Sequence, residues 1–276
     1  MTFSATDTTI YTCRLKSFEE NLGLLLDRTG LLERLSGNDT ILIKPNLVEA
    51  LEPPITTPVL LVELLIDYLR NSLSGCRIII GEGTGSLQYD THHNFSFLGY
   101  SGLAEKMGVE LIDLNEEELI HKENVECSRW PEMYLPRILD EVFLLSVPVL
   151  KAHTLAKVTL TMKNMMGCPP PKHYQGGGYW GKSKFHHRVH EAIFDLNRYR
   201  CPDFTLLDAS IGMAQAHLWG NHCNPPVNRL VAGWDPVAID AYGASLLGFN
   251  WQDIDHIRLA HEVLGLAEPL QVCEVE

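Results

Sequence analysis

Basic side chains and imidazoles gather in one apolar segment of the sequence, residues 149–174, which contains no Asp or Glu. The chain as a whole has a formal net charge of −13. A local group of cations in so acidic a protein indicates either a site for an anionic ligand or contacts with carboxylates from elsewhere in the chain. Its members are Lys151, His153, Lys157, Lys163, Lys172 and His173.

Lysine and histidine together are suited to binding a small anion and moving a proton. Lysine ammonium groups bind carboxylates and phosphates. His153 would act as general acid or base, because an imidazole titrates near neutral pH, and Asp208 or Glu82 would orient it. The residues predicted to carry out this chemistry are His153, Lys151, Lys163 and Asp208.

Polar groups follow the ends of several predicted strands. Lys44-Pro45-Asn46 ends one strand, residues 81–86 (GEGTGS) end the next, and Asp208 and Asp235 end two later ones. Because the carboxyl ends of parallel strands form one rim of a sheet, we expect these groups to converge on one site. The residues predicted to bind the ligand are Lys44, Asn46, Gly83, Thr84, Gly85, Asn164, Lys172 and Asp235.

Several of these residues also have a purely structural interpretation. Asp235-Pro236 is typical of a helix N-cap and its first helical residue. GEGTGS has the composition of a plain glycine turn. Lys163 could lie at the carboxyl end of a helix, where a cation is favourable. Lys157 is interpreted as a solvated surface residue. The apolar residues expected in the core at helical spacing are Val158, Met162 and Met165.

Two other functions remain open. A non-catalytic protein with the same cleft would bind a ligand, for example as an accessory factor for redox or cofactor maturation. A metal-dependent site would use Glu82, Asp208 and histidines of residues 186–190, since His186 and His190 are four residues apart and can reach one ion. We assign no metal ligand, because no Glu stands where an H-E-x-x-H site needs it.

Short β-rich runs alternate with helical periodicity, which predicts an α/β fold with a mostly parallel sheet and helices on both faces. We expect a single domain over residues 1–276, compact or divided into two intimate lobes. The predicted strands are Ile10–Leu15, Thr40–Ile43, Arg77–Ile80, Glu110–Leu114, Glu141–Val147, Phe204–Leu207 and Asn228–Ala232. The predicted helices are Phe18–Leu35, Pro58–Asn71, Tyr100–Met107, Thr154–Met166, Val189–Tyr199, Pro236–Leu247 and Trp251–Val263.

One span interrupts this alternation. Residues 168–184 (CPPPKHYQGGGYWGKSK) contain three consecutive prolines and a triple glycine, which exclude regular structure. Such a loop is typical of a lid over a site or of a disordered connector. Lys172 and His173 lie on it.

Composition narrows the partners. The negative charge argues against nucleic acid and against anionic membranes. The local group of Lys and His residues makes a small anionic molecule the expected partner. The first ten residues lack the pattern of a secretory signal, and the apolar run 142–150 is too short to span a bilayer. The seven cysteines form no C-x-x-C pair, which predicts free thiols in a reducing cytoplasm and neither a zinc site nor an intrinsic iron–sulfur cluster. The sequence identifies no cofactor and no oligomeric state.

Six blocks, in this order, resemble the DUF362 family from about Thr40 to Leu266: ILIKPNLV, TTPVLLVELLIDYL, IIIGEGTG, VPVLKAHTLAKVTLTMKNMMG, LLDASIGM and VAGWDPVAIDAYGASLLG. The K-x-H…T-x-x-x-K-N and G-x-D-P-V-A-x-D blocks are the most specific. Some members carry ferredoxin-type four-cysteine motifs, which this sequence lacks. It also departs from the family at Ala152, where Thr is common, and after Met213, where many members have a glycine- and proline-rich turn.

The order of strand, Thr-Pro helix, glycine turn and later K-x-H is also distantly similar to the amino-terminal domain of the nickel-pincer lactate racemases. This resemblance is one of arrangement alone. It implies one chemistry, in which His and Lys act as proton donor and acceptor on a small carboxylate.

Overall fold

The computed structural model describes residues 7–35 and 39–276. The prediction that the first ten residues are not a secretory signal therefore falls partly on residues outside the described ranges. The strands are β1 (Thr9–Arg14), β2 (Thr40–Pro45), β3 (Arg77–Glu82), β4 (Glu110–Asp113), β5 (Leu119–Glu123), β6 (Glu132–Pro136), β7 (Phe143–Val147), β8 (Val149–His153), β9 (Lys157–Thr159), β10 (Phe204–Met213), β11 (Arg229–Gly233) and β12 (Gln271–Glu274).

The helices lie between these strands. The α-helices are α1 (Phe18–Arg28), α2 (Leu31–Arg34), α3 (Val59–Ser72), α4 (Thr91–Phe97), α5 (Tyr100–Met107), α6 (Thr161–Asn164), α7 (Pro171–Tyr174), α8 (Val189–Tyr199), α9 (Pro236–Leu246) and α10 (Asp255–Ala260). The 3-10 helices are η1 (Arg137–Asp140), η2 (Met165–Gly167), η3 (Ser183–His186) and η4 (Trp251–Asp253).

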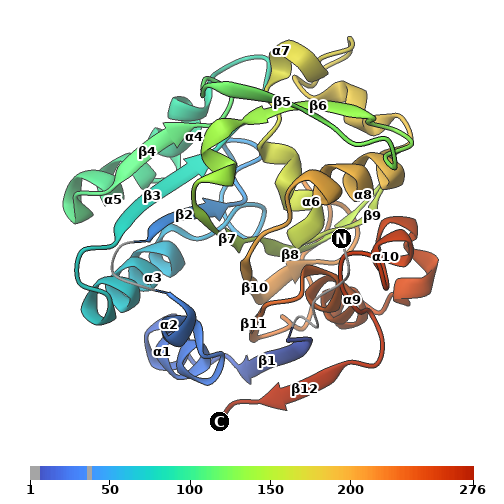
Figure 1. The fold of residues 1–276 in the computed structure, drawn as a ribbon. Coiled ribbons are helices and arrows are strands. Elements are labelled where there is room, and N and C mark those ends of the chain that lie inside the picture. The colour runs from blue at the N-terminus through green and yellow to red at the C-terminus, as the bar shows by residue number, and fades with distance from the viewer. Residues whose placement is uncertain (1–6, 36–38) are drawn as a thin grey trace.

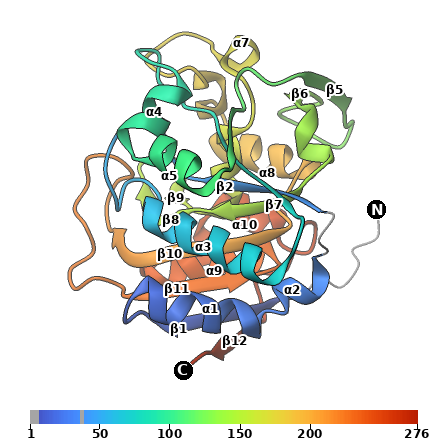
Figure 2. The same ribbon diagram turned by 90° about the vertical axis from the view of Figure 1, so that its left-hand side faces the viewer.

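The main sheet has the strand order β12-β1-β11-β10-β7-β2-β3-β4, and β8 with β9 extends from β10. The neighbours β10-β7, β7-β2, β2-β3 and β3-β4 are parallel, whereas β11 runs antiparallel to both β1 and β10. Helices α1, α3 and α5 cover one side of this sheet, and α8, α9 and α10 cover the other (Figures 1 and 2). The predicted α/β fold with a mostly parallel sheet and helices on both faces is confirmed. A single domain over residues 1–276 stays a prediction.

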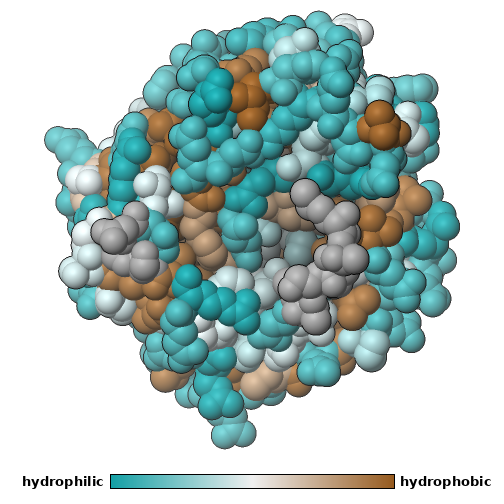
Figure 3. Space-filling model, viewed as in Figure 1, coloured by the Kyte–Doolittle hydropathy of each residue, from teal (hydrophilic) through white to brown (hydrophobic). Residues whose placement is uncertain are grey.

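Alternating side chains of the central strands build the two faces of the core. Ile41 and Ile43 of β2 pack in the cluster that contains α1 and α3, while Leu42 between them packs with α8 on the opposite face. This period of two, with apolar residues on both faces, is what a parallel sheet buried between helices requires. On the face drawn in Figure 3 the surface is largely hydrophilic, with apolar groups dispersed among polar ones.

The prediction of a helix over Thr154–Met166 is wrong. Strand β8 instead turns back into β9, and only α6 and η2 are helical. The imidazole Nδ1 of His153 accepts hydrogen bonds from the backbone N–H groups of Leu155 and Ala156, both at 3.0 Å. The side chain thus satisfies the turn locally, which is how His153 overrides the helical spacing. Val158, Met162 and Met165 are nevertheless buried, as predicted.

Several other elements have different boundaries or types from those predicted. The helix predicted over Phe18–Leu35 ends at Arg28, because Gly30 has φ 67° and starts a separate turn, α2. Short helices α7 and η3 occupy part of the span 168–184, which the sequence predicts to be irregular throughout. Hairpin β5–β6 was not predicted.

The described part of the chain contains no helix that is both long and apolar enough to cross a bilayer. All seven cysteines lie in it, and all are free thiols.

Candidate functional site

A cavity of about 370 Å³ opens where β2, β3 and β8 end. The rest of its wall comes from the turn after β8, from β9, α6 and η2, from residues 180–186, and from the stretch after β10. The lining residues are Asn46, Val48, Glu82, Gly83, Gly85, Lys151, His153, Thr154, Leu155, Thr159, Lys163, Asn164, Met166, Gly167, Trp180, Lys182, His186 and His217.

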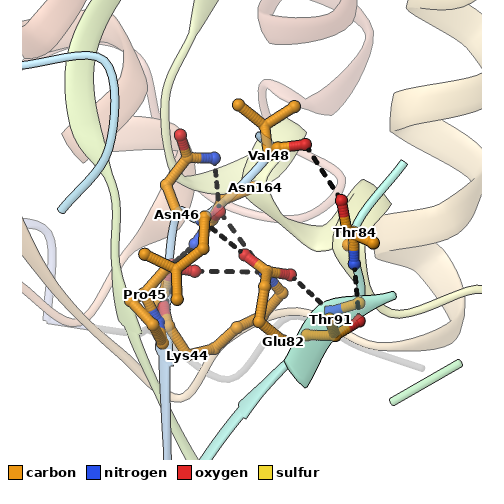
Figure 4. A network of polar contacts seen from close by, with 12 residues as sticks. Lys44, Pro45, Asn46, Val48, Glu82, Thr84, Thr91 and Asn164 are labelled. Atoms are coloured by element: carbon orange, nitrogen blue, oxygen red, sulfur yellow. Dashed lines mark hydrogen bonds and ion pairs between the residues drawn. The ribbon is translucent and has the colours of Figure 1, made fainter. Parts of the chain in front are cut away.

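A buried ion pair forms the floor of this cavity (Figure 4). The Nζ of Lys44 lies 2.6 Å from Oε1 of Glu82, and the two side chains are 0% and 2% exposed. Glu82 also accepts the backbone N–H groups of Leu47 and Gly83 at 2.9 Å each. The one carboxylate on the cavity wall, among the residues that the structure describes, is therefore fully engaged by groups of the protein.

Two asparagines connect the floor to the wall. Asn164 accepts the Nδ2–H of Asn46 at 3.0 Å and donates to the Oγ of Ser146 at 3.1 Å. Asn46 in turn accepts a 2.6 Å hydrogen bond from Nζ of Lys151, which also donates to the carbonyl of Ile55 at 2.7 Å. The network ties β2, β8 and α6 together and fixes the position of the Lys151 amine.

Burial lowers the pKa of three lysines on the wall. Lys163 and Lys182 each have a pKa lowered to about 8. Lys151 has a pKa well below its usual value, first because it is buried and second because Lys163 is near. Lys182 donates to the carbonyls of Gly83 and Gly167 at 2.8 and 2.6 Å. Within residues 7–35 and 39–276, the Nζ of Lys163 has no hydrogen-bond or ion-pair partner.

Two stacked imidazoles line the wall beside these amines. The rings of His153 and His217 lie 3.9 Å apart. Burial, followed by the charge of Lys163, lowers the pKa of His217 to about 3 and that of His153 well below its usual range, so both rings are neutral at pH 7. Because Nδ1 of His153 accepts two backbone N–H groups, its proton must be on Nε2.

Two buried polar atoms of the wall are unsatisfied. The Oγ1 of Thr159 and Nδ1 of His217 have no hydrogen-bond partner in the described part of the chain. Buried polar atoms are nearly always hydrogen-bonded, so unpaired ones beside a cavity are available to a ligand.

The two aspartates of the last family block hold the helices around the site. Asp235 caps α9 by accepting from Val237 and Ala238. Asp240 accepts the backbone N–H groups of Thr161 and Met162 at 2.8 and 3.2 Å, at the beginning of α6. Burial raises the pKa of Asp240 to about 8. Asp240 therefore fixes the short helix on which Lys163 and Asn164 stand.

The structure brings together most of the predicted site residues. Asn46, Gly83, Gly85, Lys151, His153, Lys163 and Asn164 line the cavity, and Lys44 lies beneath it. Besides Lys44, four predicted residues do not line it. Thr84 binds the carbonyl of Val48, Lys172 is exposed on α7, Asp208 accepts from the backbone of Ser210, and Asp235 caps α9.

The residues proposed for a metal site are not brought together. Glu82 and His186 line the cavity, but Asp208 does not, and Nδ1 of His190 lies 3.0 Å from Nδ1 of His256 instead. Across the described ranges, no three His, Cys, Asp or Glu side chains are grouped so that they could hold a metal ion.

Among the polar and aromatic residues that line the cavity, sequence reasoning did not predict Thr154, Thr159, Trp180, Lys182 and His217 as site residues. Trp180, Lys182 and His217 lie on irregular segments, where periodicity gives no information about direction. One signal was available, since Lys182 follows a glycine-rich run in a candidate lid.

The fold resembles that of a solved enzyme. The apoprotein of lactate racemase from Thermoanaerobacterium thermosaccharolyticum superposes with a TM-score of 0.52 at 14% sequence identity, over 91% of this chain. This chain matches 60% of the racemase chain, so it spans less than two thirds of that protein. At this identity the likeness shows the fold alone.

Two sequence comparisons complete the picture. None of the curated proteins matches the sequence. The sequence profile of the family described as Domain of unknown function (DUF362) matches residues 41–245, which hold β2, β3, β8 and the lysines of the cavity. Because the match covers well over half of the chain, the protein belongs to the DUF362 family.

Proposed function

We propose that the protein is an enzyme that binds a small organic anion in the cavity and moves a proton on it. One observation carries the proposal: Lys163 and Lys182 are on the wall, and the only carboxylate among the described lining residues, Glu82, is already paired with Lys44. The cavity is therefore positive in an acidic protein. Positive charge that is held in place without a counterion attracts an anion from solution.

Lys163 is the main anion-binding group in this proposal. With a pKa of about 8 its ammonium is mostly protonated at pH 7, and no described residue accepts a hydrogen bond from it. Lys182 adds a second charge, although two carbonyls already take part of its donor capacity. A carboxylate or phosphate oxygen would complete the shell of Lys163.

His153 and Lys151 would perform the proton chemistry. Because Nδ1 of His153 is occupied, its Nε2–H is a donor that stabilises negative charge on a substrate oxygen, and the ring does not act as a base. Lys151 donates two N–H groups to Asn46 and Ile55, so its neutral form keeps one lone pair. That lone pair would take a proton from the substrate, as a buried lysine with a lowered pKa can.

The fold neighbour indicates which anion to test first. Its name describes it as a lactate racemase, so a 2-hydroxy carboxylate is the first substrate class. Proton removal beside a carboxylate needs a base and a donor to the developing oxyanion, roles assigned above to Lys151 and His153. Inorganic phosphate tests the other anion class.

Binding tests the first half of the proposal. We expect lactate or phosphate to bind the wild-type protein in calorimetry and to raise its melting temperature. Lys163→Met should weaken binding by about tenfold or more, since a charge-assisted hydrogen bond is lost. Lys157→Met is the matched control, because Lys157 is exposed in the same segment and does not line the cavity. Equal loss in both variants would contradict an anion site at Lys163.

Hydrogen exchange tests the second half. In deuterated water, we expect the hydrogen on carbon 2 of a 2-hydroxy acid to exchange, followed by NMR. His153→Asn should abolish exchange with little loss of melting temperature, because the Asn Oδ1 can replace Nδ1 in the turn but carries no Nε2–H. His153→Ala removes both and should also destabilise the turn. Binding without exchange would identify a ligand-binding protein instead of an enzyme.

A further inference from the structure

A second pocket, also of about 370 Å³, lies against the mouth of the cavity and is rich in aromatic side chains. We call it the outer pocket. Its residues are Glu49, Ala50, Leu51, Ser86, Leu87, Gln88, Tyr89, Tyr179, Trp180 and Trp219. Trp180 belongs to both walls, so the outer pocket and the cavity meet at one indole.

Four chain segments build both spaces in succession. The stretch after β2 places residues 46 and 48 in the cavity and 49–51 in the outer pocket. The glycine turn after β3 does the same with residues 83 and 85 and then 86–89. The other two segments contribute Lys182 and His217 inside, and Tyr179 and Trp219 outside. Because the same backbone runs from one space to the other, the two form one cleft.

The shared indole is held in place. The backbone N–H of Gly181 donates to the carbonyl of Gly85 at 2.7 Å, which ties the span 168–184 to the glycine turn. A methyl group built on Gly85 would lie 3.5 Å from Cε3 of Trp180, so the indole lies beside that glycine with room for about one methyl group between them. Beyond it, Tyr179 and Trp219 are 94% and 80% exposed. Aromatic rings left this exposed beside a site are ready to stack on a flat group.

Charge differs between the two ends of this cleft. The inner end carries Lys163 and Lys182, whereas the outer end has Glu49 and no Lys or Arg among its described residues. An anionic head group is therefore attracted inward and away from Glu49. The outer end suits an uncharged, planar part of the same molecule, with Glu49 as an acceptor for a ring N–H.

We propose that the outer pocket binds an aromatic or heteroaromatic ring of the ligand whose anionic end lies in the cavity. This inference rests on the proposed function and specifies its substrate class: a carboxylate or phosphate connected by a short linker to a flat ring. Stacking on Trp180, Tyr179 and Trp219 would supply affinity that a small anion such as lactate does not obtain.

Paired ligands test the proposal, each pair differing by the ring alone or nearly so. The pairs are lactate with 3-phenyllactate, and ribose 5-phosphate with adenosine 5′-monophosphate, with Kd measured by calorimetry. In at least one pair the ring should lower Kd by about tenfold, the effect of one good aromatic stack. The pair that shows it distinguishes a carboxylate from a phosphate head group.

Variants assign the effect to the outer pocket. Trp219→Ala and Trp180→Ala should bring the ratio of the two Kd values close to one, while Trp219→Phe keeps most of it. Phe97→Ala is the matched control, since Phe97 is 57% exposed on α4 and lines neither pocket. Lys163→Met should weaken both members of a pair and leave their ratio unchanged.

The outcomes distinguish failure of the ring subsite from failure of the proposed function. If both members of each pair bind within about twofold, or if the ratio survives the double variant Trp180→Ala/Trp219→Ala, the ring subsite is wrong. If ring-bearing ligands bind but Lys163→Met has no effect on them, the anion site of the proposed function is wrong and the ring subsite stands. If neither member of either pair binds, both claims fail.

Discussion

Lys44 and Lys163 lie near each other at the same site and have opposite surroundings. Lys44 is wholly buried at 2.6 Å from the carboxylate of Glu82. Lys163 is partly buried, and its ammonium has no partner among the described residues. A lysine beside a carboxylate is held in place by the protein, and a lysine without one is left for a ligand. The charge of a residue therefore does not assign its role, whereas its partner does.

The largest effect should come from breaking the paired lysine. Glu82→Gln leaves the Lys44 ammonium buried without its counterion, and removing one partner of a buried pair costs about 3–5 kcal/mol. Urea denaturation at pH 7 measures the change in free energy of unfolding. Lys44→Met/Glu82→Gln is the control, which should recover much of this loss because no charge remains unpaired. A loss below about 1 kcal/mol in Glu82→Gln would mean that the pair contributes as little as a surface pair.

The contrast between the two lysines shows which features of the fold and of the site could be predicted from the sequence. The α/β fold followed from strand and helix periodicity, and the convergence of Lys44, Asn46 and Gly83 followed from the rim of a parallel sheet. The pairing of Lys44 with Glu82 did not, because it joins two strands whose relative register no local pattern contains. The sequence also predicts Asp208 as a site residue. In the structure Asp208 does not line the cavity, and its carboxylate accepts a hydrogen bond from the backbone N–H of Ser210.

The turn at His153 shows the same limit at a smaller scale. Helical spacing over residues 154–166 was real, since Val158, Met162 and Met165 are all buried. The spacing nevertheless belonged to a strand followed by a short helix, because Nδ1 of His153 binds the turn and Asp240 binds the beginning of α6. Both interactions are made by side chains, and the second comes from a residue far along the chain, so periodicity could not reveal them.

A smaller effect should follow from crowding the other cation of the wall, Lys182. A methyl group on Gly83 would lie 2.5 Å from both Oδ1 of Asn115 and the carbonyl of Gly167, and 2.9 Å from Nζ of Lys182, so Gly83→Ala must shift groups that surround that ammonium. We expect a loss of about 1–3 kcal/mol in urea denaturation and weaker anion binding in calorimetry.

Gly85→Ala is the matched control for Gly83→Ala, two residues along the same turn. Its new methyl group would be 3.5 Å from the indole of Trp180, which is ordinary contact. Stability and anion affinity should stay close to those of the wild type. If the two variants behave alike, the close approach at Gly83 does not position Lys182.

The smallest effect is the change with pH in the free energy of unfolding that Lys163 causes. It is also the sharpest test of the contrast between Lys163 and Lys44. The folded pKa of Lys163, about 8, lies below the value near 10.4 of an unfolded lysine. Between these values the unfolded chain binds more protons, so this group makes the free energy of unfolding rise with pH. Anion affinity should fall over the same range, because the ammonium loses its proton. Lys163→Met should remove the share of the rise in stability that comes from Lys163, and it should leave only the part of the fall in affinity that comes from Lys182, which also has a pKa of about 8.

The slope of stability with pH distinguishes a lysine kept for a ligand from a lysine paired with a carboxylate, because the two slopes have opposite signs. A carboxylate partner favours the charged form and raises the folded pKa of a lysine, so its contribution to stability is lost as the pH rises through that pKa. The difference in free energy of unfolding between wild type and Lys163→Met, measured by urea denaturation from pH 7 to 10, cancels the titrations common to both proteins. If that difference falls with pH instead of rising, Lys163 has a carboxylate partner and the cavity has lost its main anion-binding charge.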